Sequence, residues 1–128
     1  MNFTKNILIT VVLITFTSIG YAQEASSVHL KKIAEITLGL THFPSDSDKK
    51  ELSEIMSNES LSDNVRTLAH ALYNVKHQVN KTDNKELTKI IDDQTTQSSV
   101  KSIAIILKNL NHKITTNDKA SLKKIIDA

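Results

Sequence analysis

Three histidines, His42, His77 and His112, stand 35 residues apart and are the side chains of this sequence best suited to chemistry. Imidazole binds zinc, copper and iron, and three imidazoles form a complete protein ligand set for one catalytic-type zinc ion. Helical units stacked in a row would place equivalent residues about 10 Å apart, whereas zinc holds each nitrogen at about 2.0–2.1 Å. The spacing therefore predicts a ladder of exposed histidines near the ends of helices, with a metal or haem site as the alternative.

Two further groups of residues resemble metal sites less closely. His70 and His77 are seven residues apart, two turns along one helix face, whereas metal pairs on a helix usually lie four apart. Asp46, Asp48 and Glu51 resemble part of a calcium loop but lack its glycine and its twelve-residue ligand spacing, so we interpret them as a helix cap. Neither group predicts a metal ion, and the sequence indicates no catalytic residue and no cofactor.

The elements that must position these histidines belong to a unit of 35 residues that occurs three times without insertion or deletion. The units cover residues 24–58, 59–93 and 94–128. Matching positions include Leu30, Val65 and Val100; Ile33, Leu68 and Ile103; Ala34, Ala69 and Ala104; and Leu52, Leu87 and Leu122. Periods of this size are typical of helical-hairpin arrays.

Within each unit, apolar residues recur every three or four positions, which is the spacing of one helix face. This predicts a long first helix at residues 27–43, 64–79 and 99–114, followed by a short second helix. Ser47, Thr82 and Asn117 are the expected N-caps of the second helices, and Asp48 with Glu51 or Asp83 with Glu86 can be read as capping boxes. The predicted fold is all-α: three tandem hairpins, or six helices, in a short solenoid-like stack or a compact helical bundle.

The N-terminal residues 1–22 have the three parts of a secretory signal peptide. Lys5 precedes an uncharged, mostly apolar run at residues 7–19, and Gly20 and Ala22 put small residues before a cleavage point at Gln23. A spanning helix needs about 20 apolar residues, so no stable membrane span is expected after removal of the signal. We therefore expect a single helical-repeat domain at residues 23–128, secreted or in the periplasm of a bacterial envelope.

Composition limits the classes of partner and of chemistry. The formal net charge of +2 falls to +1 when Lys5 is removed with the signal peptide, so nothing attracts the protein to nucleic acid. The absence of cysteine excludes disulfides and thiolate metal sites. Helix packing alone must stabilise the domain, which is more typical of bacterial envelope proteins than of small animal secreted domains.

Departures from the repeat indicate where a partner would bind. The matching positions Leu38, Tyr73 and Lys108, like Phe43 and its counterparts, grade from apolar to basic and are expected to form one lateral surface. Ile105 replaces polar residues of the other units. We take Leu38, Phe43, Tyr73 and Ile105 as the candidate partner surface. The predicted function is a non-catalytic protein-binding or scaffolding module whose partner is another protein or a second copy; the alternative is a histidine-based metal- or haem-binding envelope protein.

Overall fold

The computed structural model describes residues 18–128, and within them the chain is entirely helical apart from its loops, which confirms the predicted all-α class. Residues 1–17, the larger part of the predicted signal peptide, lie outside the described residues. The helices are α1 (Ser18–Leu38), α2 (Asp46–Ser57), α3 (Asp63–Tyr73), α4 (Lys81–Asp92), α5 (Ser98–Lys108) and α6 (Thr116–Asp127). Among them, none combines the length and the apolar character needed to cross a membrane.

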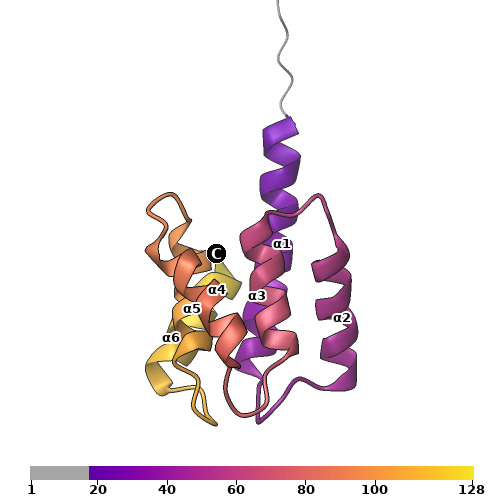
Figure 1. Ribbon diagram of the computed structural model, residues 1–128. Helices are drawn as coiled ribbons and strands as arrows, with labels where there is room; N and C mark the ends of the chain where they lie inside the picture. The colour runs from indigo at the N-terminus through magenta and orange to yellow at the C-terminus, as the bar shows by residue number, and fades with distance from the viewer. Residues whose placement is uncertain (1–17) are drawn as a thin grey trace, which may run out of the picture.

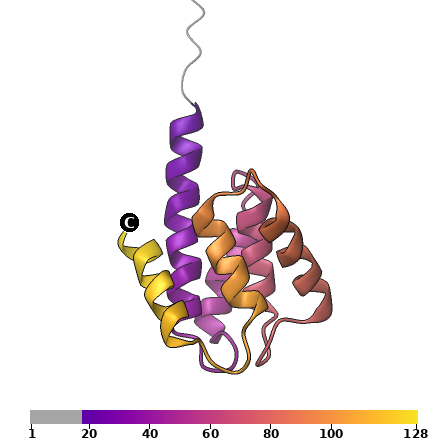
Figure 2. The ribbon, with the colours of Figure 1, turned by 90° about the vertical axis from the view of Figure 1, so that its left-hand side faces the viewer.

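The six helices form an inner and an outer layer (Figures 1 and 2). The inner helices α1, α3 and α5 contact one another. Each outer helix packs against the inner helix of the next hairpin: α2 against α3, α4 against α5, and α6 back against α1, as Figure 2 shows. The hairpins thus close into a ring, which is the compact-bundle form of the predicted fold. In an open stack the first and last units would not meet. Here α6 contacts α1, so the hairpins do not form an open stack.

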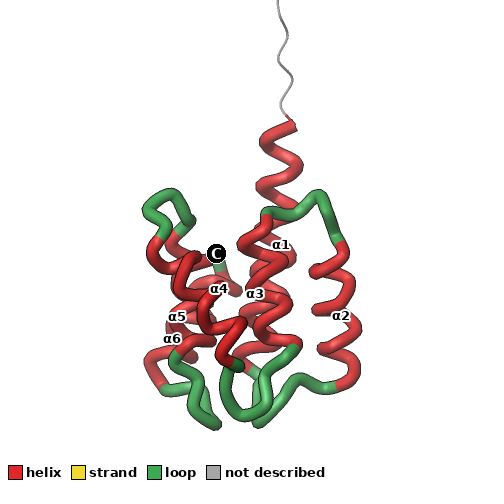
Figure 3. The backbone as a smooth tube through the Cα atoms, viewed as in Figure 1, coloured by secondary structure: helices red, strands yellow, loops and turns green. Residues whose placement is uncertain are grey.

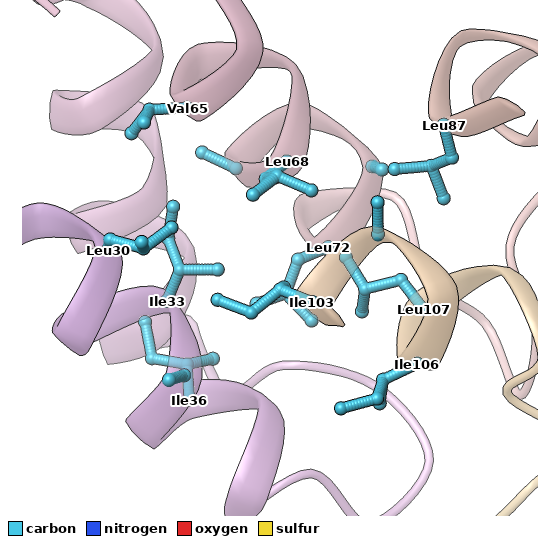
Figure 4. Close-up of a cluster of buried hydrophobic side chains, with 14 of the residues drawn as sticks. Leu30, Ile33, Ile36, Val65, Leu68, Leu72, Leu87, Ile103, Ile106 and Leu107 are labelled. Carbon is cyan, nitrogen blue, oxygen red and sulfur yellow. The ribbon is translucent and has the colours of Figure 1, made fainter. Parts of the chain in front are cut away.

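The core lies along the axis of this ring, and residues 35 positions apart occupy matching places in it (Figure 4). Three sets of equivalent side chains have no exposed surface at all: Ile33, Leu68 and Ile103; Ala34, Ala69 and Ala104; and Leu52, Leu87 and Leu122. The first two sets lie on the inner helices and the third on the outer helices. Because each unit supplies the same sizes of side chain, the three units fill the centre of the bundle in the same way.

The N-caps of the outer helices lie two residues before the predicted ones. Ser45, Asn80 and Thr115 are the N-caps, and the side chain of each accepts a hydrogen bond from the backbone N–H three residues on. Asp48 and Asp118 return the contact and complete capping boxes. The predicted caps Ser47, Thr82 and Asn117 and the boxes with Glu51 and Glu86 are therefore wrong. A Ser/Asn/Thr-x-x-Asp pattern that starts two residues earlier provides the cap, and its carboxylate lies near the positive end of the helix dipole.

The inner helices end earlier than predicted, at Leu38, Tyr73 and Lys108 instead of near residues 43, 79 and 114. Apolar residues beyond these ends do continue the helical spacing, but they belong to loops and are buried there. Gly39, Asn74 and Asn109 follow the last helical residue in the three units. Glycine and asparagine are common just after a helix in sequence, although none of the three has the left-handed backbone of a glycine-type C-cap.

The first helix is longer than the other inner helices and extends beyond the end of the bundle (Figure 1). It passes through the predicted cleavage point between Ala22 and Gln23 without a break. Leu30 is the first buried side chain that the structure describes in it. Removal of residues 1–22 would therefore leave the described core contacts of α1 in place.

Candidate functional site

Three equivalent loops meet at one end of the bundle, which we call the loop end (Figure 3). They are residues 39–45, 74–80 and 109–115, and each connects the inner helix of a hairpin to the outer helix of the same hairpin. Every loop has two apolar anchors, of which only Leu40 is partly exposed: Leu40 and Pro44, Val75 and Val79, Leu110 and Ile114. The three residues between the anchors are exposed in all three loops. The anchors therefore hold a short tip outside the core, and its central residue is a histidine each time.

Backbone hydrogen bonds join the three tips to one another. The N–H of His77 donates to the carbonyl of His42 at 2.8 Å, and the N–H of His112 donates to the carbonyl of His77 at 2.9 Å. His42, His77 and His112 form what we call the histidine cluster. Because backbone atoms make these bonds, the relative position of the loops does not depend on the side chains that the tips carry.

Two members of the cluster have an unusual backbone conformation. His77 has a φ of 69° and His112 a φ of 62°, and no other non-glycine residue in the described part of the chain has a positive φ. The left-handed region disfavours a residue with a Cβ atom by about 1–2 kcal/mol. Histidine tolerates this region better than most residues. Strain of this kind is retained where the surrounding structure fixes it and is often found at functional sites.

The imidazole rings of the cluster are in contact. The ring centroids of His42 and His77 are 5.0 Å apart at an interplanar angle of 76°, and those of His77 and His112 are 5.0 Å apart at 51°. All three side chains are exposed. The predicted spacing of about 10 Å and the predicted place on the last turns of helices are therefore wrong. The histidines form a row of two close contacts, His42 with His77 and His77 with His112, because backbone hydrogen bonds join their loops in that order.

His70 does not belong to the cluster. Its Nδ1 lies 2.8 Å from Oδ1 of Asp83, a carboxylate that is buried although the histidine is half exposed. Asn74 and Asn80 donate to the other oxygen of the same carboxylate. These bonds connect the end of α3 to the start of α4. His70 therefore contacts Asp83 and does not pair with His77. The network stabilises the turn between α3 and α4.

Three of the four residues predicted to bind a partner, Phe43, Tyr73 and Ile105, are exposed, and Leu38 is partly buried against the core. Leu38 and Tyr73 are equivalent positions at the ends of α1 and α3, two helices that contact each other. Tyr73 is 36% exposed, with the Lys49 ammonium 5.8 Å from its ring centre. Ile105, on α5, is 43% exposed. Phe43, which is 60% exposed, lies in a loop tip next to His42, and Leu38 and Tyr73 are the last residues of α1 and α3, directly before loops of the same end.

The opposite end of the bundle carries an open cleft of about 840 Å³. Its floor includes the equivalent residues Leu30, Val65 and Val100, and serine, threonine and amide side chains form most of its rim. Glu24 is the one charged side chain that lines it. This rim of small neutral groups selects no class of ligand, and we assign the cleft none.

Candidate metal-binding groups in the described residues remain separate. No three histidine, aspartate or glutamate side chains there are arranged to hold one ion as they stand. Asp48, predicted to belong to a cap instead of a calcium loop, has that role: its Oδ2 accepts from the N–H and the hydroxyl of Ser45 at 3.0 and 2.7 Å. Sequence reasoning identified the histidines but missed their meeting, for which the only local signal was their place between two apolar anchors.

No protein family, characterised protein or solved structure was found to match this chain. The functional argument therefore depends on the geometry of the described residues.

Proposed function

We propose that this protein is a non-catalytic binding module that binds another protein chain through its loop end. The observation that supports the proposal is the union of three exposed loops into one surface by backbone hydrogen bonds between the histidines. Two of these histidines retain a left-handed backbone. A loop with only a connecting role would avoid that strain with glycine or asparagine.

Phe43 supplies the apolar contact that such a surface needs. Its side chain is 60% exposed, whereas the equivalent positions carry the polar residues Gln78 and Lys113. Aromatic residues are enriched in protein interfaces, and a few of them surrounded by polar groups contribute most of the binding free energy. In this proposal Phe43 is the anchor, and the histidine tips form the polar surroundings.

The same proposal includes the compartment and the domain boundaries. Residues 1–22 act as a signal peptide, and the three repeats at residues 23–128 form one secreted or periplasmic domain. We propose no catalytic role. The His70–Asp83 pair orients an imidazole as a catalytic base would be oriented, but the hydrogen bonds of this ring lead to carboxylate and amide groups and to no nucleophile.

A matched pair of variants tests the proposal. Phe43→Ser removes the anchor at the loop end, and Val28→Ser removes an equally exposed apolar side chain from α1, since both residues are 60% exposed. Proteins retained from envelope extract are identified by mass spectrometry, and the affinity of each is then measured with purified components. We expect a partner that binds wild type and Val28→Ser alike and binds Phe43→Ser at least tenfold more weakly. Equal affinity for all three forms would refute the loop end as the binding surface.

A further inference from the structure

We propose that the histidine cluster binds one divalent transition-metal ion of the zinc, nickel or copper class. His77 would be the shared ligand, and His42 and His112 would complete the site. This proposal depends on the geometry of the three loops and is independent of the protein-binding function proposed above. Such a site would make the loop end responsive to metal ions.

The distances between the rings fit a shared ion. Two imidazoles on one tetrahedral zinc have nitrogens about 2.0–2.1 Å from the metal, which places the nitrogens about 3.3 Å and the ring centres about 5 Å apart. The two ring contacts of the cluster, His42 with His77 and His77 with His112, each have a centroid separation of 5.0 Å. His77 can therefore share an ion with either neighbour where the loops stand, and an ion held by all three requires the outer two rings to turn towards His77. Binding needs the rings to turn their nitrogens towards a common point.

The backbone and the solvent make that rotation possible. The hydrogen bonds from His77 to His42 and from His112 to His77 fix the backbones that carry the rings. The side chains themselves are exposed, so no packed neighbour has to move when they rotate. As they stand, the rings of His42 and His77 meet edge-on at 76°, and those of His77 and His112 are tilted at 51°. In this arrangement they do not form a metal site. Preformed backbones limit the entropy lost on binding to that of the rings, which favours affinity.

The surrounding residues select the class of metal. The loop tips contain no carboxylate, and Lys76 and Lys113 flank the histidines. Calcium and magnesium prefer several oxygen ligands, which these tips do not supply as carboxylates. Imidazole nitrogen suits zinc, nickel and copper. Three histidines also leave a fourth position on the ion open, as in zinc sites with three protein ligands and a water.

The arrangement predicts an order of importance among the three histidines. His77 takes part in both ring contacts, whereas His42 and His112 take part in one each. Loss of His77 leaves two rings that are not paired with each other. Loss of His42 or His112 leaves one pair able to share an ion. A surface that binds metal through scattered histidines would show no such order.

Asparagine is the suitable replacement, because it tolerates the left-handed backbone of His77 and His112 but offers no imidazole. We would titrate zinc and nickel into the purified protein by calorimetry at neutral pH, with a competing chelator, for wild type and for H42N, H77N and H112N. His29, on α1 and outside the cluster, provides the control H29N. Circular dichroism of each variant confirms that the fold is kept.

We expect one ion per chain for wild type and H29N. H77N should lower the affinity by more than the 10–100-fold that follows loss of a mere supporting partner, and H42N and H112N should lower it less. Bound metal should also raise the Tm of wild type and leave that of H77N unchanged. Binding that is weak and non-stoichiometric, or equal in H77N and H29N, would overturn the proposal. Phe43→Ser, which tests the protein-binding function, should bind the ion normally, so failure of one proposal is distinguishable from failure of the other.

Discussion

Enlarging the alanines of the inner helices tests the closed ring directly. Ala34, Ala69 and Ala104 have no exposed surface, so leucine in their place must push neighbouring side chains or helices apart. Overpacking of this kind destabilises a protein by about 1–3 kcal/mol. For a domain of this size, that corresponds to a fall in Tm of about 5–20 °C. Ala120→Leu, on an exposed position of α6, is the matched control and should change the stability by less than about 0.5 kcal/mol.

The comparison among the three sites distinguishes a ring from a row. In a row of hairpins the middle unit is covered on both sides, so Ala69→Leu would be the most damaging of the three. In the ring, α6 covers α1 just as α2 covers α3, and the three variants should therefore lose similar stability. Thermal and denaturant unfolding followed by circular dichroism measures all four proteins. An unchanged Tm for Ala69→Leu, or a much smaller effect at positions 34 and 104, would refute this account of the core.

Three further predictions follow from the described contacts. Leu122→Ala should lower the free energy of unfolding by about 2–5 kcal/mol in urea denaturation, because its side chain on the last helix has no exposed surface; a change below 1 kcal/mol would mean that α6 is not part of the core. Asp83→Ala should cost about 1–3 kcal/mol, because its buried carboxylate accepts hydrogen bonds from Asn74 and Asn80, and His70→Ala less, since its side chain is 53% exposed; equal losses would contradict this division. Intact-mass measurement of the exported protein should find its first residue at Gln23 or Glu24; retention of residues 1–22 would indicate an anchor.

The periodicity of apolar residues in the sequence predicts which side chains of each unit are buried. The set that includes Ile33, Leu68 and Ile103 was identified as core from its spacing, and these residues are fully buried. Helix ends were less predictable, because Val75 and Val79 continue the helical spacing while they anchor a loop. Periodicity detects which side chains are buried but not whether their backbone is helical, and in these loops the buried residues are not helical.

The meeting of the histidines could not be predicted from local pattern. It depends on the angle between successive hairpins, which is set by packing between units such as that of α6 on α1. The left-handed backbone of His77 and His112 likewise follows from the hydrogen bonds between loops, which no single unit contains. The sequence therefore identified the residues of the candidate site but spaced them about 10 Å apart, whereas neighbouring rings are 5.0 Å apart.

The contact between α1 and α6 also determines when the protein can fold. It joins the first and last helices, so nearly the whole chain must be present before the first hairpin acquires its second neighbour. Linear repeat proteins can fold from any unit outwards, and each added unit contributes a similar increment of stability. Here the closing contact has a high sequence separation, which slows folding and makes it all-or-none. A partly synthesised chain has an exposed apolar face on α1, and only the arrival of the final helix covers it.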